Sequence, residues 1–278
     1  MTQPRNRWIV NIVLAIAVLA FVGVSMVPII AAFRDTQNSN QNPDNSQGTT
    51  NNTASQKVKL QEEIRGLELV LQREPENQAT LKSLLERRLQ LLSLGEGSVR
   101  NVIEPLEKLS KLNPEQTNYA ILLAQAKQQI GDKEGAAQAY RSVLTVKPGD
   151  IKALQGMVTL LLAQKRPEAA IGLLEETLSK APQVNKIEPG SVDIIAVQIL
   201  LGNVYATQKN FAKALSTYDT ASKFDVQDFR PVLAKAITLK GQGKIEDAKP
   251  VFAKAASLAP AKYKDEINKQ ATTTSKAE

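Results

Sequence analysis

Apolar side chains recur along this chain with a long period, and within each period they have helical spacing. Ala136 and Ala170 lie 34 residues apart, as do Ala214 and Ala248. A bulky residue follows each alanine four positions later, where it shares the same helix face. These four residues are Tyr140, Leu174, Tyr218 and Phe252. A fixed period of this length predicts one helical unit stacked on copies of itself.

Prolines have the same period, and they set the expected limits of each unit. Pro114, Pro148 and Pro182 are 34 residues apart, and Pro260 lies twelve residues after Ala248. Because proline cannot continue a helix, we expect it to end each unit. The four predicted units are residues 117–150, 151–184, 195–228 and 229–262. Each is expected to contain two helices joined by a tight turn, such as Gly131–Asp132.

The third unit resembles the tetratricopeptide repeat (TPR) family most closely. Leu201, Gly202, Tyr205, Ala214 and Tyr218 stand where that family has leucine, glycine, tyrosine, alanine and an aromatic residue. The residues that carry the resemblance across all units are Ala136, Tyr140, Pro148, Ala170, Leu174, Pro182, Leu201, Gly202, Tyr205, Ala214, Tyr218, Ala248, Phe252 and Pro260. The resemblance implies an all-α fold, a right-handed TPR α-solenoid of antiparallel helix pairs.

The resemblance extends beyond the four units on both sides. Residues 57–116 are expected to hold a capping helix, at 57–74, and a degenerate unit, at 83–116, with Val102 and Leu106 in the key places. Residues 263–278 are expected to form a C-terminal capping segment and tail.

The N-terminus predicts a membrane anchor. Residues 8–33 contain no charged side chain, and at about 1.5 Å per residue they can span a bilayer core of roughly 30 Å. Basic residues in 1–7 precede this span, and a polar, Asn-rich linker follows it at 34–56. The charge asymmetry places the N-terminus in the cytoplasm and the repeats on the extracytoplasmic or lumenal side. We therefore expect a single-pass protein of a bacterial inner membrane or a thylakoid.

Composition argues against most kinds of catalytic site. The chain has no cysteine and no histidine, which removes thiol and imidazole nucleophiles, Ser-His-Asp triads and Cys/His metal sites. We predict a protein that is not an enzyme and has no cofactor or metal. The net charge of +7 is uneven: residues 57–208 hold 19 Lys or Arg against 18 Asp or Glu, and residues 209–276 hold 13 against 7.

TPR proteins usually bind their ligands on the concave face formed by the first helix of each unit, so the resemblance implies a partner-binding groove. The positions in this sequence are Asn118, Ile121, Gln125, Gln128, Lys152, Gln155, Thr159, Leu162, Ala196, Ile199, Asn203, Thr207, Arg230, Leu233, Ile237 and Lys240. Their amides suit the backbone of an extended peptide, and their aliphatic side chains suit its apolar residues. Ile121 and Gln125 replace the lysine and asparagine with which chaperone-binding TPR proteins grip a C-terminal carboxylate.

Two interpretations of function remain open at this point. The first is a membrane-tethered adaptor or scaffold that binds an extended segment of a partner protein and aids assembly of a membrane complex. It resembles anchored TPR proteins that assist photosystem or thylakoid biogenesis. The second is electrostatic binding of a membrane surface or nucleic acid by the basic C-terminal repeats, although no nucleic-acid partner is expected.

Two further expectations can be checked against the structure. Arginine at both Gln125 and Asn203 should block partner binding without unfolding the repeats. The extra segment 185–194 should form a turn at Pro189–Gly190 and start the next helix with Ser191 as its N-cap, either as a spacer or as a contact.

Overall fold

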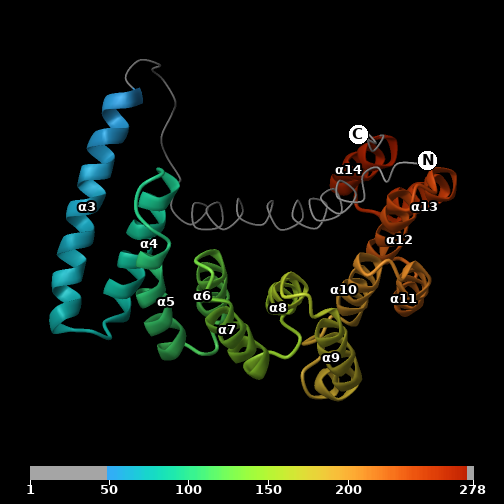
Figure 1. Ribbon diagram of the computed structural model, residues 1–278, viewed down its shortest axis with the longest axis horizontal. Helices are drawn as coiled ribbons and strands as arrows, with labels where there is room; N and C mark the ends of the chain where they lie inside the picture. Colours follow the sequence, from blue (N-terminus) through green and yellow to red (C-terminus); the bar gives the residue numbers. More distant parts are fainter. Residues whose placement is uncertain (1–48, 274–278) are drawn as a thin grey trace, which may run out of the picture. The chain divides into compact units, whose positions relative to one another are not determined.

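The computed structural model describes residues 49–273, and these residues form helices without any strand (Figure 1). The all-α prediction is therefore confirmed for this part of the chain. The helices are α3 (Thr49–Arg73), α4 (Gln78–Ser93), α5 (Arg100–Leu112), α6 (Thr117–Gln129), α7 (Lys133–Val146), α8 (Ile151–Ala163), α9 (Pro167–Ile187), α10 (Ile194–Thr207), α11 (Phe211–Phe224), α12 (Phe229–Gly241), α13 (Ile245–Leu258) and α14 (Ala261–Thr272). Residues 49–235 form one compact unit and residues 236–273 another.

The expected membrane span at 8–33 and most of the linker at 34–56 lie outside the described residues. Within 49–273, no helix combines the length and the apolar character needed to cross a bilayer. Helix α3 begins at Thr49, so the last eight residues assigned to the linker are helical.

The turn between the two helices of each repeat unit has one residue in the left-handed backbone region. This residue is Gly131 in the first unit, with φ 84°, and Gly243 in the fourth, with φ 78°. The second and third units have Lys165 and Lys209 at the same place, with φ 58° and 59°. The repeat period therefore preserves the backbone conformation even where it does not preserve the glycine.

Side-chain caps determine where several of these helices start. The carboxylate of Asp132 accepts a hydrogen bond from the backbone N–H of Gly135, and that of Asp150 accepts from Lys152 and Ala153. These bonds satisfy amide groups that have no partner inside the helix.

Two contiguous hydrophobic clusters hold the larger unit together. The first extends from α3 to α8 and the second from α8 to α12. The periodic alanines and bulky residues of the first three units lie in these clusters, and Ala248 and Phe252 of the fourth unit are buried in α13. Ala136, Ala170 and Ala214 have no exposed surface, and neither do Leu174 and Tyr218.

Two helical glycines allow tyrosine rings to approach the backbone of a neighbouring helix. A Cβ atom at Gly202 in α10 would lie 2.3 Å from Cε1 of Tyr218 in α11. A Cβ atom at Gly156 in α8 would lie 2.2 Å from Cζ of Tyr140 in α7. Tyr218 therefore joins the helices of one repeat unit, whereas Tyr140 joins one unit to the next.

Pro182 does not end its unit, and this expectation was wrong. Helix α9 continues through Pro182 to Ile187, about one and a half turns further. The residues around the proline gain tertiary contacts, since Ala181 is buried and Val184 packs against the second cluster. These contacts outweigh the lost backbone hydrogen bond.

The degenerate N-terminal unit also differs from its expected limits. It is the helix pair α4 and α5, which begins at Gln78 and not at residue 83. Val102 and Leu106 are buried in it. Pro105 lies inside α5 and cannot bond the carbonyl of Asn101, and the guanidinium of Arg88 donates to that carbonyl over 2.5 Å. A side chain from α4 thus satisfies the carbonyl that has no hydrogen-bond donor within α5.

The smaller unit consists of the end of α12 with α13 and α14. Phe252 and Ala255 of α13 and Ile267 of α14 are buried there. The ammonium group of Lys240 donates to the backbone carbonyl of Gln270, near the C-terminus of α14. Cations are favourable at this end of a helix, so Lys240 helps to hold α14.

Candidate partner-binding surface

The first helices of the repeat units are neighbours in space, as a binding face requires. Helix α6 contacts α8, and α8 contacts α10. Ala234 in α12 packs against the cluster that contains Val197 and Leu201 of α10. The predicted positions in each helix recur at spacings of three and four residues, which places them along one helix face.

Five polar side chains on α6 and α8 have no hydrogen bond or ion pair within the described part of the chain. We call this set the α6–α8 polar surface, and it consists of Asn118, Gln125, Lys152, Gln155 and Thr159. Asn118, Lys152 and Gln155 are exposed, while Gln125 and Thr159 are half-buried. Their donors and acceptors are available to a partner.

Ile121 does not belong to this surface. It is 4% exposed and lies in the first hydrophobic cluster, so it cannot take a side chain of a bound peptide. The sequence period placed Ile121 on the correct helix but could not show that neighbouring helices bury it. Leu162, Ile199 and Leu233 are half-buried, and Ile237 is 39% exposed.

The side chains of Asn203 and Gln128 already have hydrogen-bond partners, which are the hydroxyls of buried tyrosines. Asn203 Oδ1 accepts a hydrogen bond from the hydroxyl of Tyr218 over 2.7 Å, and Gln128 Oε1 accepts from Tyr140 over 3.4 Å. Arginine at position 203 would remove the acceptor from a tyrosine with no exposed surface. We therefore expect the Asn203 substitution to disturb the repeats, and a test of the surface should leave Asn203 unchanged.

Arg230 and Lys240 also have internal partners. Arg230 forms ion pairs with Asp193 over 2.7 Å and with Asp228 over 2.6 Å. Lys240 donates to α14, and burial lowers its pKa. The hydroxyl of Thr207 donates to the backbone carbonyl of Asn203, and Ala196 is half-buried. Among the predicted polar positions, those without an internal side-chain partner in the described residues therefore lie on α6 and α8.

The extra segment, residues 185–194, is folded, and we call it the brace. It begins in the last turn of α9 and ends at the first residue of α10. Its turn lies at Pro189–Gly190 as expected, with φ 82° at Gly190 and a hydrogen bond from Ser191 N–H to the carbonyl of Glu188. The N-cap of α10 is Asp193 and not Ser191, because the Asp193 carboxylate accepts from the N–H of Ala196. The hydroxyl of Ser191 is buried without a partner among the described residues.

Contacts on both sides of the brace hold it in place. The Asn185 side chain accepts from Val192 N–H over 2.8 Å and donates to Val192 O over 2.9 Å. A Cβ atom at Gly149, in the turn before α8, would lie 2.1 Å from the carbonyl oxygen of Ser191. Burial alone would raise the pKa of Asp193, but Arg230 and two backbone N–H groups outweigh burial and lower it. The segment therefore contacts the preceding and the following units.

The hydroxyls of Tyr140 in α7 and Tyr205 in α10 have raised pKa values. Burial raises the pKa of Tyr140 to about 12. Burial also raises the pKa of Tyr205, and its hydrogen bond to the Glu175 carboxylate over 3.1 Å adds to this effect. Both groups therefore stay protonated at neutral pH and act as structural donors.

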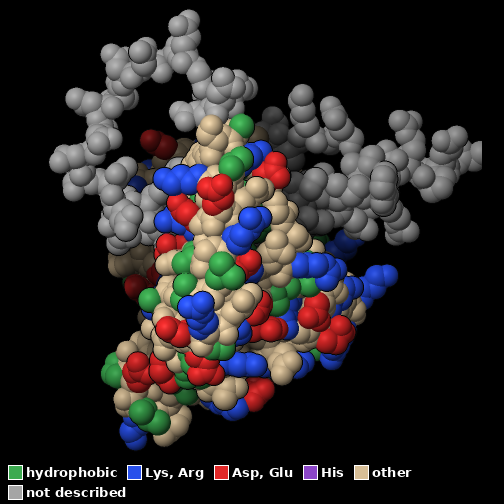
Figure 2. Space-filling model, turned by 90° about the vertical axis from the view of Figure 1, so that its left-hand side faces the viewer, with side chains coloured by type: hydrophobic (Ala, Val, Ile, Leu, Met, Phe, Trp, Pro, Cys, Tyr) green, Lys and Arg blue, Asp and Glu red, His purple; other side chains and the backbone are tan. Residues whose placement is uncertain are grey.

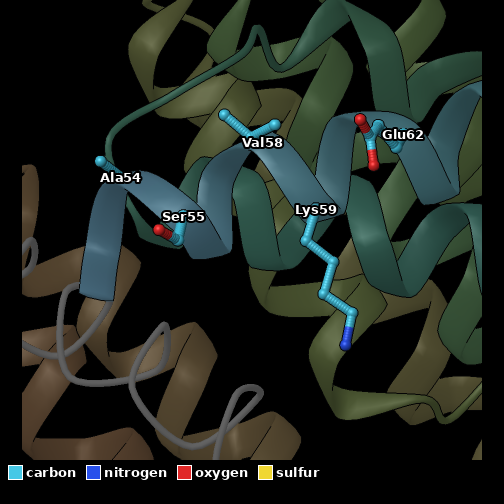
Figure 3. A pocket seen from close by; sticks show the side chains of 5 residues that line it. All are labelled: Ala54, Ser55, Val58, Lys59 and Glu62. Atoms are coloured by element: carbon cyan, nitrogen blue, oxygen red, sulfur yellow. The ribbon is translucent and has the colours of Figure 1, made fainter. Parts of the chain in front are cut away.

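The residues within 49–273 include no group of three or more Asp or Glu side chains placed to hold a metal ion. A shallow, open depression lies along α3 (Figure 3), and α3 alone supplies its lining, Ala54, Ser55, Val58, Lys59 and Glu62. A depression on one helix cannot enclose a small ligand.

Comparison with known proteins supports the repeat assignment. Residues 131–192, which span α7 to the brace, match the sequence profile of a family described as Tetratricopeptide repeat. This part of the chain therefore has the sequence pattern of tetratricopeptide repeats. Proteins of this kind are interaction scaffolds, and that general function fits the helix pairs and the polar first-helix surface.

Two relatives show similarity over different lengths. The protein SLOW GREEN 1, chloroplastic, of Arabidopsis thaliana is 28% identical over 204 residues, which are 73% of this chain. Cellulose synthase operon protein C of Pseudomonas fluorescens (strain SBW25) is 30% identical over 112 residues, or 38% of this chain. The matches cover 62% of the length of the first relative and 9% of the second.

Two solved structures are similar at low sequence identity. Yeast Tom70 has a TM-score of 0.50 and 16% identity, and the match covers 75% of this chain and 42% of Tom70. The TPR protein TTC0263 of Thermus thermophilus has a TM-score of 0.42 and 20% identity, over 68% of this chain and 98% of that chain.

Proposed function

We propose that this TPR protein is a membrane-tethered adaptor that holds an extended segment of another protein along the α6–α8 polar surface. In this proposal it aids the assembly of a membrane complex and performs no catalysis itself. The observation that carries the proposal is the set of five polar side chains on two adjacent first helices that make no internal bond within the described residues. Polar side chains that do not stabilise their own fold are available for recognition.

The chemistry of this surface suits an extended peptide. Gln125, Gln155 and Asn118 each offer an amide donor and an amide acceptor, which match the N–H and C=O groups of a peptide backbone. Lys152 adds one exposed cation for a carboxylate of the partner. An extended segment presents its backbone groups at regular intervals, so two neighbouring helices can bond it at several points.

The membrane part of the proposal rests on the sequence and on one relative. The uncharged span at 8–33 would tether the repeats, and the basic residues before it favour repeats on the extracytoplasmic or lumenal side. The relative from Arabidopsis is named as chloroplastic, which favours a photosynthetic membrane over a bacterial envelope for the assembled complex.

Internal pairing weakens the alternative of charge-driven binding by the basic C-terminal region. Lys235 pairs with Asp219, Lys249 pairs with Glu246, and Lys240 donates to a backbone carbonyl of α14. These contacts reduce the field that an anionic surface would meet.

Affinity capture from detergent-solubilised native membranes tests the adaptor. The full chain is compared with the double variant Gln125→Arg, Gln155→Arg, and mass spectrometry identifies the captured proteins. We expect subunits or assembly factors of one membrane complex to be enriched with the wild type and lost with the variant. Gln138→Arg with Gln183→Arg is the matched control, because these exposed glutamines lie on the second helices α7 and α9.

Capture that is unchanged in the Gln125, Gln155 variant would overturn the proposed surface. Salt then separates the two mechanisms of binding. Recognition of a peptide backbone should weaken little between low and high salt, whereas charge-driven binding should fall steeply.

A further inference from the structure

The outer face of α3 carries a second row of side chains with the spacing of a helix-pairing seam. On its inner row, Ile64, Leu67 and Leu71 pack in the first cluster, and Leu60 in the same row is buried. The opposite row, Val58, Glu62, Arg65 and Leu69, repeats the same intervals of four, three and four residues. Val58 is 55% exposed and Leu69 is 56% exposed.

This outer row is unusual for the end of a repeat array, where a polar face normally meets water. Figure 2 looks onto the side of the molecule that carries α3, where hydrophobic side chains alternate with basic and acidic ones. In Figure 3, Val58 and Glu62 project from the same side of α3. Val70 is also 42% exposed, and a Cβ atom at Gly66 would meet nothing within 4 Å. A second helix can therefore approach α3 closely here.

The charges on this face have no partner within the described residues. Glu62 and Arg65 are exposed and form no ion pair there. In contrast, Glu63 pairs with Arg87 of α4 over 2.8 Å, and Glu68 pairs with Arg88 over 2.6 Å. The inward charges thus attach α3 to its own chain, while the outward charges remain to be matched.

The outer row is complementary to itself in the antiparallel direction. If Glu62 of one copy lies opposite Arg65 of another, symmetry also places Arg65 opposite Glu62. Four residues further out, Val58 of one copy then lies opposite Leu69 of the other. A parallel pair in register would instead place each charge beside an identical one, which is unfavourable.

We propose that two copies of this chain form a homodimer through the outer faces of their α3 helices, packed antiparallel about a two-fold axis. Each Val58 contacts Leu69 of the other copy, and each Glu62 pairs with the opposite Arg65. A two-fold contact requires a surface that is complementary to itself, because every residue pair occurs twice. The dimer leaves the α6–α8 polar surface uncovered, since that surface lies on other helices.

Charge reversal tests the pairing in the full chain. Sedimentation of the detergent-solubilised protein over a range of concentrations measures its self-association. Glu62→Arg places two like-charged pairs in the contact, so we expect the dimer to weaken about tenfold or more, and Arg65→Glu to do the same. Glu62→Arg combined with Arg65→Glu restores opposite charges and should restore the dimer. Glu86→Arg, at an exposed site in the middle of α4, is the control.

Cysteine pairing tests the register independently, since the natural chain has no cysteine. A differently tagged pair of variants, Val58→Cys and Leu69→Cys, should form a mixed disulfide-linked dimer under mild oxidation. Val58→Cys alone should not, because antiparallel packing separates the two copies of residue 58 by about 17 Å along the helix.

Three results would overturn the proposal. They are a wild type that sediments as a monomer throughout, a dimer that the single charge reversals leave unchanged, and cross-linking of Val58→Cys alone at the rate of the mixed pair. Circular dichroism of each variant checks that the helices remain folded, so that a lost dimer reports the contact itself.

Discussion

The left-handed turn residue differs chemically between repeat units although its backbone conformation is the same. Gly131 and Gly243 adopt this conformation without a Cβ penalty, whereas Lys165 and Lys209 adopt it at φ 58° and 59°. The lysines must be held there by the helices on either side. Backbone strain of this kind lowers the free energy of unfolding, and a substitution that removes the strain should raise it.

We predict that Lys165→Gly and Lys209→Gly each raise the free energy of unfolding by roughly 1 kcal/mol, because glycine relieves the strain at positive φ. Gly131→Ala should lower it, since the Cβ atom introduces that strain. Urea melts followed by circular dichroism measure all three. A loss of stability in both lysine variants would show that these side chains make contacts worth more than the strain.

The hydroxyl of Tyr140 makes stability depend on alkaline pH. Its pKa is 10.0 when unperturbed and about 12 in the folded protein, because of burial. Because the pKa of Tyr140 is higher in the folded than in the unfolded protein, protonated Tyr140 contributes fully to the free energy of unfolding below pH 10. This contribution is lost as the pH rises through 12. Over that window we expect the wild type to lose about 2–3 kcal/mol relative to Tyr140→Phe.

Urea melts of the wild type and of Tyr140→Phe at several pH values between 8 and 12 isolate this effect, since both proteins share every lysine. If the difference in unfolding free energy between the two proteins is the same at pH 9 and pH 11.5, Tyr140 is not protected by burial.

At the scale of the helices, close approach depends on glycines that a helix would otherwise disfavour. Gly202 lies inside α10, where alanine would normally stabilise the helix by about 1 kcal/mol. The Tyr218 ring occupies the space that a Cβ atom would need, at 2.3 Å. The contact between α10 and α11 therefore outweighs local helix propensity.

Gly202→Ala is expected to destabilise the protein by about 1–3 kcal/mol through overpacking against Tyr218. The control is Gly172→Ala in α9, because a Cβ atom there meets nothing within 4 Å. That substitution should stabilise by roughly 0.5–1 kcal/mol. Thermal melts of the two variants should shift in opposite directions, and a shift in the same direction would contradict the packing described for Tyr218.

At the scale of the whole molecule, a repeat unit is stabilised mainly by the units next to it, so the stability of the array depends on its ends being covered. In the smaller unit, α14 supplies this cover through Ile267, which is 2% exposed, and through its bond to Lys240. The rest of α14 is mostly polar and exposed. Ile267 is therefore its main attachment.

We predict that Ile267→Ala destabilises the packing of α14 on α13 by about 2–5 kcal/mol, because it removes most of the apolar contact and leaves a cavity. Hydrogen exchange should then show faster exchange for the amides of α13 and α14. Tyr263→Ala, at a site 42% exposed, is the control and should change exchange far less. Equal exchange in Ile267→Ala and the wild type would show that α14 does not cover α13.

The sequence by itself determined the helix pairs, their order and most of the buried positions. These properties depend on residues within one 34-residue period: alanines and aromatic residues four apart lie on one face, and turn residues follow at a constant distance. Such local patterns act in the same way wherever the unit stands in the chain.

Only the tertiary structure decided which predicted site residues are available. Asn203 bonds Tyr218 fifteen residues away, and Arg230 bonds Asp193, which is 37 residues away. Pro182 stays inside α9 because residues of other helices pack against the extended end. Such choices depend on free-energy differences between contacts that form only when distant segments meet, and no local pattern in the chain records them.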